Sequence, residues 1–393
     1  MKAIELFAGA GGLGLGVSRA GFSPQMIIEW DRWCCDTIRE NRRDGFGLIG
    51  TWPEPTEGDV RGVDFRTLEG KIDLITGGPP CQPFSLGGKH RAHADSRDMW
   101  PEAVRALRET KPKAFIFENV KGLTRESFAT YLSHIVLQMT YPELTAKYGE
   151  DWEGHLSRLE KHHTGHRGST GLEYNVVYRV LNAANYGVPQ RRERVVFVGF
   201  RNDLDIEWSF PRETHSHDAL LSDQLKGNYW ERHKVRKADR IVDDRHWGRL
   251  DRLTKKTDVL PWRTTRDAIS DLPDPELEPL KAKKHHDHRF QAGARTYPGH
   301  TGSPLDEPGK TLKAGVHGVP GGENMLRRPD GSVRYFTVRE SARLQTFPDE
   351  FRFHGSWTET MRQLGNAVPV ELASVIARSV KHHLTFGGSD FLK

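Results

Sequence analysis

The sequence GGPPCQPFS at residues 77–85 directly follows a short, largely apolar run at residues 72–75. We interpret this run as a buried strand that ends at the pair of glycines. Pro79 and Pro80 fix φ and lack backbone donors, so the segment can neither continue a β-ladder nor begin an ordinary helix. Such a loop suits the task of holding the Cys81 side chain rigidly at the carboxyl end of a sheet, where α/β folds bind their ligands.

Cysteine usage limits the possible chemistry. The chain has three cysteines, Cys34, Cys35 and Cys81, and no CxxC pair. This count excludes a zinc finger or ribbon and argues against a disulfide scaffold, so we expect no metal and a reducing compartment. Most lone cysteines fill space in a core. The prolines on both sides of Cys81 favour a thiol that is placed for reaction instead.

Length and charge set broader bounds. At 393 residues the chain is long for one compact core and suits two domains. It carries 58 Lys and Arg against 53 Asp and Glu, a formal net charge of +5, which permits a nucleic-acid partner without predicting one. The amino terminus lacks the apolar core of a signal peptide, and no apolar run approaches a membrane span. We therefore expect a soluble, cytoplasmic protein.

A glycine-rich turn follows the first predicted strand, residues 3–7. Gly9, Gly11 and Gly14 satisfy the pattern G-x-G-x-x-G. Glu29 lies 20 residues after Gly9, at the end of a second predicted strand. In this fingerprint the glycines let the backbone approach a nucleotide and the acid binds ribose hydroxyls. Enzymes that use NAD, FAD or S-adenosylmethionine all have such a turn, so the pattern alone leaves the cofactor open.

Polar side chains follow the later predicted strands. The run at residues 114–117 ends in Glu118 and Asn119, on the rim that also carries Cys81. The two side chains suit base recognition, although an Asn in this position could instead cap a helix. Near the start of a further strand at residues 194–198 lies the pattern Q-x-R-x-R, whose arginines would by default form exposed salt bridges.

The remaining regions are less regular. Apolar spacing predicts a helix over residues 143–159, followed by an exposed basic loop at residues 161–167 with solvated histidines. Residues 226–237 mix aromatic rings with cations, which suits DNA contact, or an exposed charged surface without a partner. A capping box at residues 337–340 opens a helix. An apolar stripe after Pro369 predicts another helix, which packs back on the first domain.

The motif at residues 77–85 resembles the catalytic motif of the DNA cytosine-5 methyltransferases, in which the cysteine attacks the base. Other motifs of that family occur along the chain in the family's order. They are FAGAGG at residues 7–12, before the cysteine motif, and then ENV at 118–120, Q-x-R-x-R at 190–194, TVRESARLQTFP at 337–348 and QLGNAVP at 363–369. The resemblance covers nearly the whole chain except about residues 130–170 and 205–330. The chain is identified as a member of this family, of the bacterial restriction–modification type.

The resemblance implies S-adenosylmethionine as the cofactor and S-adenosylhomocysteine as its product. Phe7 would stack on adenine, and Glu29 would bind the ribose beside Trp30. Asp59 would contact adenine, or alternatively it caps a turn as many loop acids do. The implied cofactor site consists of Phe7, Gly9, Gly11, Gly12, Leu13, Glu29, Trp30, Asp59, Val60, Pro79, Asn366 and Val368.

The resemblance also implies the chemistry. Cys81 would attack C6 of a cytosine flipped out of the duplex, Glu118 would donate to N3, and Arg192 would hydrogen-bond O2, with Arg194 near the flipped base and its flanking phosphate. The implied catalytic residues are Cys81, Pro80, Glu118, Asn119, Arg192 and Arg194, and the implied DNA contacts are Gln82, Ser85, Arg97 and Gln190. The polar composition of residues 85–98 is that of a lid over substrate, or of a solvated surface loop.

The implied fold is α/β: a Rossmann-like, S-adenosylmethionine-dependent methyltransferase with a mostly parallel sheet and helices on both faces, plus a smaller, irregular or β-rich target-recognition domain. We expect the catalytic domain at residues 1–200, completed by residues 355–393, and the recognition domain at residues 201–354. The expected partner is double-stranded DNA, with association to the nucleoid when bound. A monomer is the default, because a flipped base needs one active site.

Two rival functions remain. A tRNA cytosine-5 methyltransferase would share these motifs, but the long region at residues 201–335 favours a DNA recognition domain. A non-catalytic DNA-binding protein of the same fold would not need Cys81, Glu118 and the two arginines, all of which are intact. The residues do not predict which base sequence is recognised.

Overall fold

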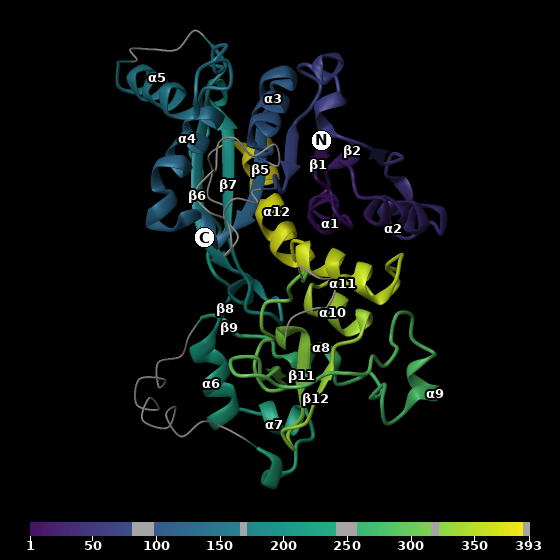
Figure 1. Cartoon of the computed structure of the whole chain (residues 1–393). Coiled ribbons are helices and arrows are strands. Elements are labelled where there is room, and N and C mark those ends of the chain that lie inside the picture. The colour runs from purple at the N-terminus through teal and green to yellow at the C-terminus, as the bar shows by residue number, and fades with distance from the viewer. Residues whose placement is uncertain (81–97, 166–170, 241–257, 316–321, 388–393) are drawn as a thin grey trace.

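A seven-stranded sheet organises the amino-terminal half of the chain (Figure 1). The computed structural model describes residues 1–80, 98–165, 171–240, 258–315 and 322–387. The strand order is β3-β2-β1-β4-β5-β7-β6, and every pair is parallel except those of β7, which is antiparallel to β5 and β6. The strands are β1 (Lys2–Leu6), β2 (Ser23–Glu29), β3 (Thr56–Glu57), β4 (Leu74–Gly77), β5 (Ala114–Val120), β6 (Tyr174–Asn182) and β7 (Glu193–Arg201). The predicted mostly parallel sheet is confirmed.

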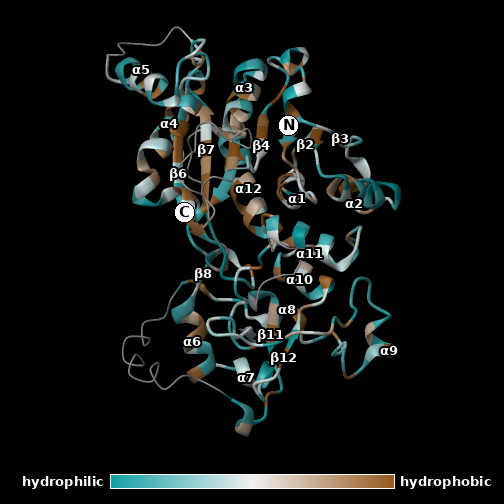
Figure 2. Cartoon of the chain, in the orientation of Figure 1, coloured by the Kyte–Doolittle hydropathy of each residue, from teal (hydrophilic) through white to brown (hydrophobic). Residues whose placement is uncertain are grey.

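Helices cover both faces of this sheet. They are α1 (Gly12–Arg19), α2 (Arg32–Arg43), α3 (Trp100–Thr110), α4 (Ala129–Thr140) and α12 (Val370–Phe386), while α5 (Trp152–Gly165) packs on α4. Side chains alternate between the faces along a strand. Ile116 and Val198 therefore pack with α1 and α12, while Phe115 and Phe197 pack with α3 and α4. Figure 2 shows the resulting apolar centre as brown ribbon in β4, β5 and β7.

Short elements form the rest of the chain, which Figure 1 shows below the sheet. They are β8 (His215–Ser216), α6 (His217–Lys226), α7 (Tyr229–Arg232), β9 (Leu260–Pro261), α8 (Thr265–Ile269), α9 (Pro279–Ala282), β10 (Ser303–Pro304), β11 (Met325–Arg327) and β12 (Val333–Tyr335). The last three strands make a small sheet, β10-β11-β12. A small, irregular second part was expected, whereas the domain boundaries at residues 200 and 355 remain a prediction. Among the described residues, no helix is both long and apolar enough to cross a membrane.

Two further helices, α10 (Val338–Leu344) and α11 (Trp357–Asn366), lie between the sheet and these short elements (Figure 1). The predicted capping box begins α10. The Thr337 hydroxyl accepts from the Glu340 N–H at 3.1 Å, and the Glu340 carboxylate accepts from the Thr337 N–H at 2.9 Å. Glu340 also pairs with buried Arg334 at 2.6 Å, so the cap fixes β12 to α10.

The helix predicted over residues 143–159 is wrong in its bounds. The chain forms α4, then a loop over residues 141–151 that contains Pro142 and Gly149, and only then α5. Proline disfavours helical continuation, and Gly149 adopts a φ of 76°, so the apolar spacing across this loop is not that of one helix. The predicted loop at residues 161–167 is also wrong for residues 161–165, which are helical because α5 continues to Gly165.

The aromatic rings in residues 226–237 do not form a surface for stacking bases. Tyr229 and Trp230 are buried and pack with Leu220. The Trp230 N–H donates to the Gln224 carbonyl at 2.7 Å, and the Tyr229 hydroxyl donates to Asp306 at 2.9 Å. These rings are the core of a small cluster, which corrects the DNA-contact interpretation for them.

The close packing of α1 on α12 joins the two ends of the chain. Gly16 makes this approach possible, because a Cβ there would lie 2.5 Å from the Ala373 Cβ and 2.6 Å from the Val370 carbonyl oxygen. The predicted return of the carboxy-terminal helix to the first sheet is confirmed.

We expect Gly16→Ala to destabilise the fold by about 1–3 kcal/mol, because the added methyl group must push α1 away from α12. Gly62→Ala is the matched control, since a Cβ there meets nothing within 4 Å. Urea unfolding of both variants gives the comparison. Equal stabilities for the two variants would contradict the close helix contact.

Candidate active site

The turn between β1 and α1 has an unusual backbone. Phe7, Gly9 and Gly11 all adopt positive φ, at 54°, 55° and 85°. Positive φ is rare for a bulky residue such as Phe7 and is found mainly at functional sites. Gly12 allows a second close approach, because a Cβ there would lie 2.5 Å from the Val368 carbonyl oxygen. The turn therefore packs directly against the motif at residues 363–369.

Glu29 fastens this turn to the end of β2. Its carboxylate accepts from the Gly9 N–H at 2.6 Å and from the N–H groups of Trp30 and Asp31 at 2.8 Å each. Burial raises the pKa of Glu29, the three N–H donors lower it, and the negative charge of Asp31 raises it further. The acid is thus held at the position where the fingerprint places a ribose-binding group.

The other predicted cofactor residues surround this turn. The Trp30 side chain is 76% exposed beside Glu29. Asp59 caps the short 3-10 helix Val60–Gly62 by accepting from the Arg61 N–H at 2.9 Å, which is the turn-capping alternative. Its contact with adenine remains a prediction.

An adenosyl cofactor fits these residues. A Cβ built on Gly9 or on Gly58 would meet nothing within 4 Å, so open space lies beside the turn and beside the Asp59 loop. The same edge presents the Glu29 carboxyl group and the exposed Trp30 ring. A carboxylate for hydroxyls, a ring face for a purine and accessible backbone are the groups such a cofactor requires.

Glu5 is a site residue that sequence reasoning missed. It stands on β1, directly under the turn, and accepts from the Gly14 N–H at 2.8 Å. Its second oxygen, Oε2, has no hydrogen-bond partner among the described residues. Burial raises the pKa of Glu5 to about 8, with Glu29 adding to the increase and the Gly14 N–H opposing it. The signal was an acid inside an otherwise apolar strand, Ala3-Ile4-Glu5-Leu6.

The end of β5 meets the end of β4 at the proline loop. The Asn119 amide donates to the Pro79 carbonyl at 2.9 Å and accepts from the Val120 N–H at 2.8 Å. Asn119 therefore anchors the loop from within a strand, and the helix-cap alternative is wrong. Four predicted site residues, Cys81, Gln82, Ser85 and Arg97, lie outside the described residues, so their placement is not tested.

Glu118 forms a nearly buried ion pair with Arg194. The Arg194 Nε lies 2.8 Å from the Glu118 carboxylate, and the two side chains are 13% and 10% exposed. Burial raises the pKa of Glu118, even though the charges of Arg194 and Arg192 oppose the shift. A buried carboxyl group of this kind can hold a proton, which a donor to a base requires.

Arg192 and Gln190 are completely buried and bind backbone. The Arg192 guanidinium donates to the Leu312 carbonyl at 3.0 Å and to the Gly365 carbonyl at 2.7 Å. The Gln190 amide donates to the Leu344 carbonyl at 3.2 Å and accepts from the Leu312 N–H at 3.1 Å. Both side chains thus bind backbone, while the Arg192 Nε has no hydrogen-bond partner among the described residues. The O2 contact of Arg192 and the DNA contact of Gln190 remain predictions.

Comparison with known proteins identifies the family. A family model described as C-5 cytosine-specific DNA methylase matches residues 1–143 and 168–382. The chain belongs to this family. It is a DNA cytosine-5 methyltransferase. The methyltransferase is 33% identical over 395 residues to the Type II methyltransferase M.PspPI of Psychrobacter sp. (strain TA137), covering 98% of this chain and 80% of that relative.

Other relatives and solved structures agree. The methyltransferase is 33% identical over 383 residues to M.NgoMIV of Neisseria gonorrhoeae, covering 96% of each chain. Its fold is similar to that of the S. pombe Dnmt2 methyltransferase, with a TM-score of 0.57, 16% identity, and coverage of 98% of this chain and 100% of that one. The Entamoeba histolytica methyltransferase EhMeth gives a TM-score of 0.55 at 14% identity, with 98% of each chain covered. At these identities the two structures support the fold alone.

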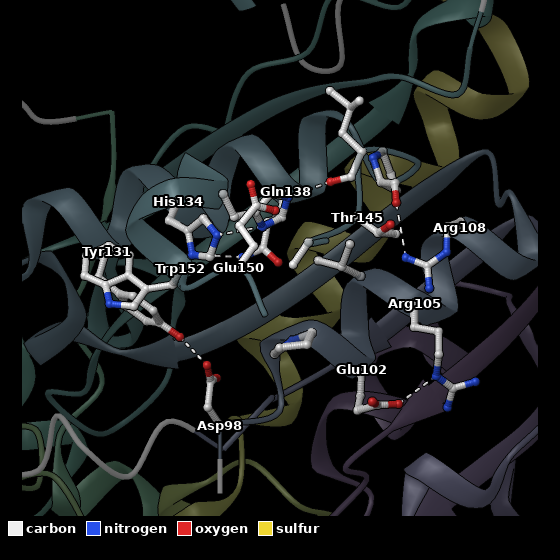
Figure 3. Close-up of a pocket in the computed structure, with 16 residues that line it drawn as sticks. Asp98, Glu102, Arg105, Arg108, Tyr131, His134, Gln138, Thr145, Glu150 and Trp152 are labelled. Carbon is white, nitrogen blue, oxygen red and sulfur yellow. Dashed lines mark hydrogen bonds and ion pairs between the residues drawn. The ribbon is translucent and has the colours of Figure 1, made fainter. Parts of the chain in front are cut away.

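Between its two matched stretches the family model leaves out residues 144–167, which contain all of α5. A pocket of about 350 Å³ lies between this segment and helices α3 and α4 (Figure 3). In it, the His134 Nε2 and the His155 Nδ1 lie 3.1 Å apart, and the Tyr131 hydroxyl donates to Asp98. Among the described residues that line the pocket, none belongs to the predicted cofactor or catalytic sets.

We expect Arg192→Lys and Arg194→Lys to have different effects. Arg192→Lys should lower the free energy of unfolding by about 1.5–3 kcal/mol. A lysine ammonium cannot reproduce the two-pronged guanidinium contact, so one of the two buried backbone carbonyls loses its charged donor. Arg194→Lys should change stability less and turnover more, since it alters the partner of Glu118. Urea unfolding and methyl-transfer assays measure the two effects. The reverse ranking in both assays would contradict the distinction between the two arginines.

We expect Glu5→Gln to flatten the pH dependence of stability. Unfolded Glu5 releases its proton near pH 4.5 and folded Glu5 near pH 8, so folding stability falls as pH rises between these values. The variant keeps a neutral side chain of the same shape and should gain on the order of 4 kcal/mol over the wild type at about pH 9. Urea unfolding at about pH 4.5 and pH 9 tests this. Parallel pH profiles for the two proteins would show that Glu5 titrates normally.

Proposed function

We propose that this methyltransferase extrudes a cytosine from duplex DNA and methylates its C5 within one short sequence. The observation that carries the proposal is the rim at the ends of β4 and β5, where Asn119 holds Pro79 and Arg194 pairs with Glu118. Cys81 comes two residues after Pro79 in the sequence. A cytosine within a duplex cannot reach such a rim, so it must leave the stack at a cost of about a few kcal/mol.

Cys81 is the proposed nucleophile. Its thiolate forms a bond to C6 of the cytosine, and the electrons of the C5–C6 double bond make C5 nucleophilic. A free thiol has a pKa of about 8.5, so its proton must leave before or during the attack. S-adenosylmethionine, when bound, supplies the methyl group that C5 takes. A base then removes the C5 proton, the double bond re-forms, and the thiolate of Cys81 leaves.

Glu118 and Arg194 are the proposed partners of the extruded base. Attack at C6 is favoured when negative charge on N3 and O2 is stabilised. Glu118 donates a proton to N3, a role that burial favours by raising its pKa, and N3 returns this proton when the Cys81 thiolate leaves. Arg192 is the proposed donor to O2 through its Nε, which has no hydrogen-bond partner among the described residues, while its two terminal nitrogens bind backbone carbonyls. Arg194 is proposed to lie beside the base as the partner of Glu118.

S-adenosylmethionine is the proposed cofactor, held by the turn after β1. Glu29 binds the ribose hydroxyls, with the Trp30 ring beside it, and Phe7 stacks on the adenine. The support for this assignment is the positive φ at Phe7 together with the carboxyl group that Glu29 holds against the turn. The remaining proposed contacts are Gly9, Gly11, Gly12, Leu13, Asp59, Val60, Pro79, Asn366 and Val368.

We propose that the enzyme is the modification partner of a restriction–modification system, because relatives such as M.PspPI and M.NgoMIV are Type II methyltransferases. Residues 201–354 would read the DNA sequence, while residues 1–200 and 355–393 perform the chemistry. The proposed state is a monomer that associates with nucleoid DNA.

The test of this function is bisulfite sequencing of plasmid DNA and total RNA from a methylation-deficient host that expresses the chain. We expect protected cytosines within one short, recurring DNA sequence, which also reveals the target. Protection in RNA alone would reassign the enzyme to tRNA. Complete conversion of both nucleic acids, with folded and soluble protein, would favour the non-catalytic alternative.

We expect Cys81→Ser to abolish methyl transfer while leaving DNA and cofactor binding largely intact, because a serine hydroxyl is a far weaker nucleophile than a thiolate. Cys34→Ser is the control, since burial and neighbouring acids raise the pKa of the Cys34 thiol, which is unsuited to attack. Transfer of radiolabelled methyl groups to target DNA measures both variants. Wild-type turnover by Cys81→Ser would remove the nucleophile assignment.

A further inference from the structure

Residues 281–300 carry nearly all of the net charge of the chain. They contain five Lys and Arg (Lys281, Lys283, Lys284, Arg289 and Arg295) and one acid, Asp287, so their net charge is 5 − 1 = +4 against +5 for the whole chain. We call residues 281–300 the basic arm. It begins within α9, which Figure 1 shows projecting sideways from the small sheet, on the side where α2 lies.

The acidic residues that precede the basic arm do not neutralise its outer surface. Asp271 pairs with Arg343 at 2.5 Å, and Asp274 pairs with Arg328 at 3.1 Å. Glu276 also pairs with Arg328, at 2.7 Å. These acids therefore bind arginines of the protein body. Residues 271–300 as a whole are close to neutral in sequence. In space, however, these acids face the protein body and are separated from the cations of the basic arm.

The cations of the basic arm behave differently. Lys283, Lys284 and Arg289 are all exposed. None of the three has a side-chain hydrogen bond or ion pair to another described residue, in contrast to Lys281, which pairs with Glu278. Exposed charges without internal partners contribute nothing to the fold that we can identify. They are available to an external polyanion.

The base of the basic arm is rigidly anchored. His288 is fully buried and hydrogen-bonds the Thr337 hydroxyl at 2.8 Å and the Pro273 carbonyl at 2.7 Å. Asp287 adopts a φ of 60° and accepts from the Phe353 N–H at 3.2 Å. A strained residue persists only where its surroundings hold it. The three free cations are thus displayed on a fixed support, which reduces the entropic cost of binding.

A contact also relates the basic arm to the half of the chain that contains the glycine-rich turn. The Arg352 guanidinium lies 3.2 Å from the His286 Nε2 and 3.5 Å from Asp44, which follows the end of α2. The arm base therefore lies beside both parts of the molecule rather than at a free tip.

We propose that Lys283, Lys284 and Arg289 bind backbone phosphates of the DNA that flanks the target sequence. This inference rests on the proposed function, and it adds a sequence-independent contact to the enzyme. The ordinary alternative is a solvated charged surface. The charge separation, the absence of internal partners among the described residues and the rigid base favour a phosphate-binding surface.

The test is the salt dependence of DNA binding by the full chain and by the variant Lys283→Ala/Lys284→Ala/Arg289→Ala. The probes are a duplex of about 14 base pairs and one of about 30, each centred on the target that bisulfite sequencing finds. On the longer duplex, loss of three phosphate contacts should reduce the slope of log K against log salt concentration by about 2.7. On the shorter duplex, which offers fewer flanking phosphates, the reduction in slope should be smaller.

The matched control is Lys71→Ala/Lys147→Ala/Lys161→Ala, which removes three exposed lysines from other parts of the surface. It should keep the wild-type slope on both duplexes. Turnover at saturating DNA should be unchanged in both triple variants. An unchanged slope for the arm variant, with normal methylation by the wild type, would overturn this inference alone. Absence of methylation by the wild type would instead overturn the proposed function.

Discussion

The buried guanidinium of Arg192 joins three segments that are remote in the sequence. From its position just before β7 it donates to the Leu312 carbonyl and to the Gly365 carbonyl, 120 and 173 residues away. Burial lowers the pKa of Arg192 well below its ordinary value, so holding this charge is costly, and the backbone acceptors offset the cost. A Cβ on Gly365 would collide with the backbone at Ala314, which shows how closely the segments approach. The positions of the segment at Leu312 and of the motif at residues 363–369 relative to β7 both depend on this junction.

The same region controls the charge state of Glu118. One carboxyl group lies near two arginines, yet burial still raises its pKa. Desolvation destabilises both the carboxylate and the guanidinium of Arg194, whose pKa burial lowers. The Glu118–Arg194 pair is therefore already largely shielded from bulk water. This is the preorganisation that transition-state stabilisation requires.

Charge pairing distinguishes the body of the protein from its periphery. In the small-sheet half, Arg266, Arg334 and Arg343 each bind an acid that fixes one element to another. In the basic arm, Lys283, Lys284 and Arg289 lack such partners among the described residues, and α5 lies in a segment that the family model does not match. Surface ion pairs contribute little to stability, so unpaired cations on a rigid support are better explained by a partner than by the fold.

The sequence by itself determined the strands, the glycine-rich turn, the capping box at Thr337 and the order of the family motifs, because these depend on local periodicity and on short-range geometry. It did not determine which side chains meet. The Q-x-R-x-R pattern does not distinguish the roles of Arg192 and Arg194. In the structure, Arg192 binds backbone carbonyls and Arg194 binds Glu118. Tyr229 and Trp230 have the composition of a stacking surface and lie in a core. Only the tertiary structure decided these outcomes, since burial and pairing depend on segments that lie from about 75 to more than 170 residues apart in the sequence.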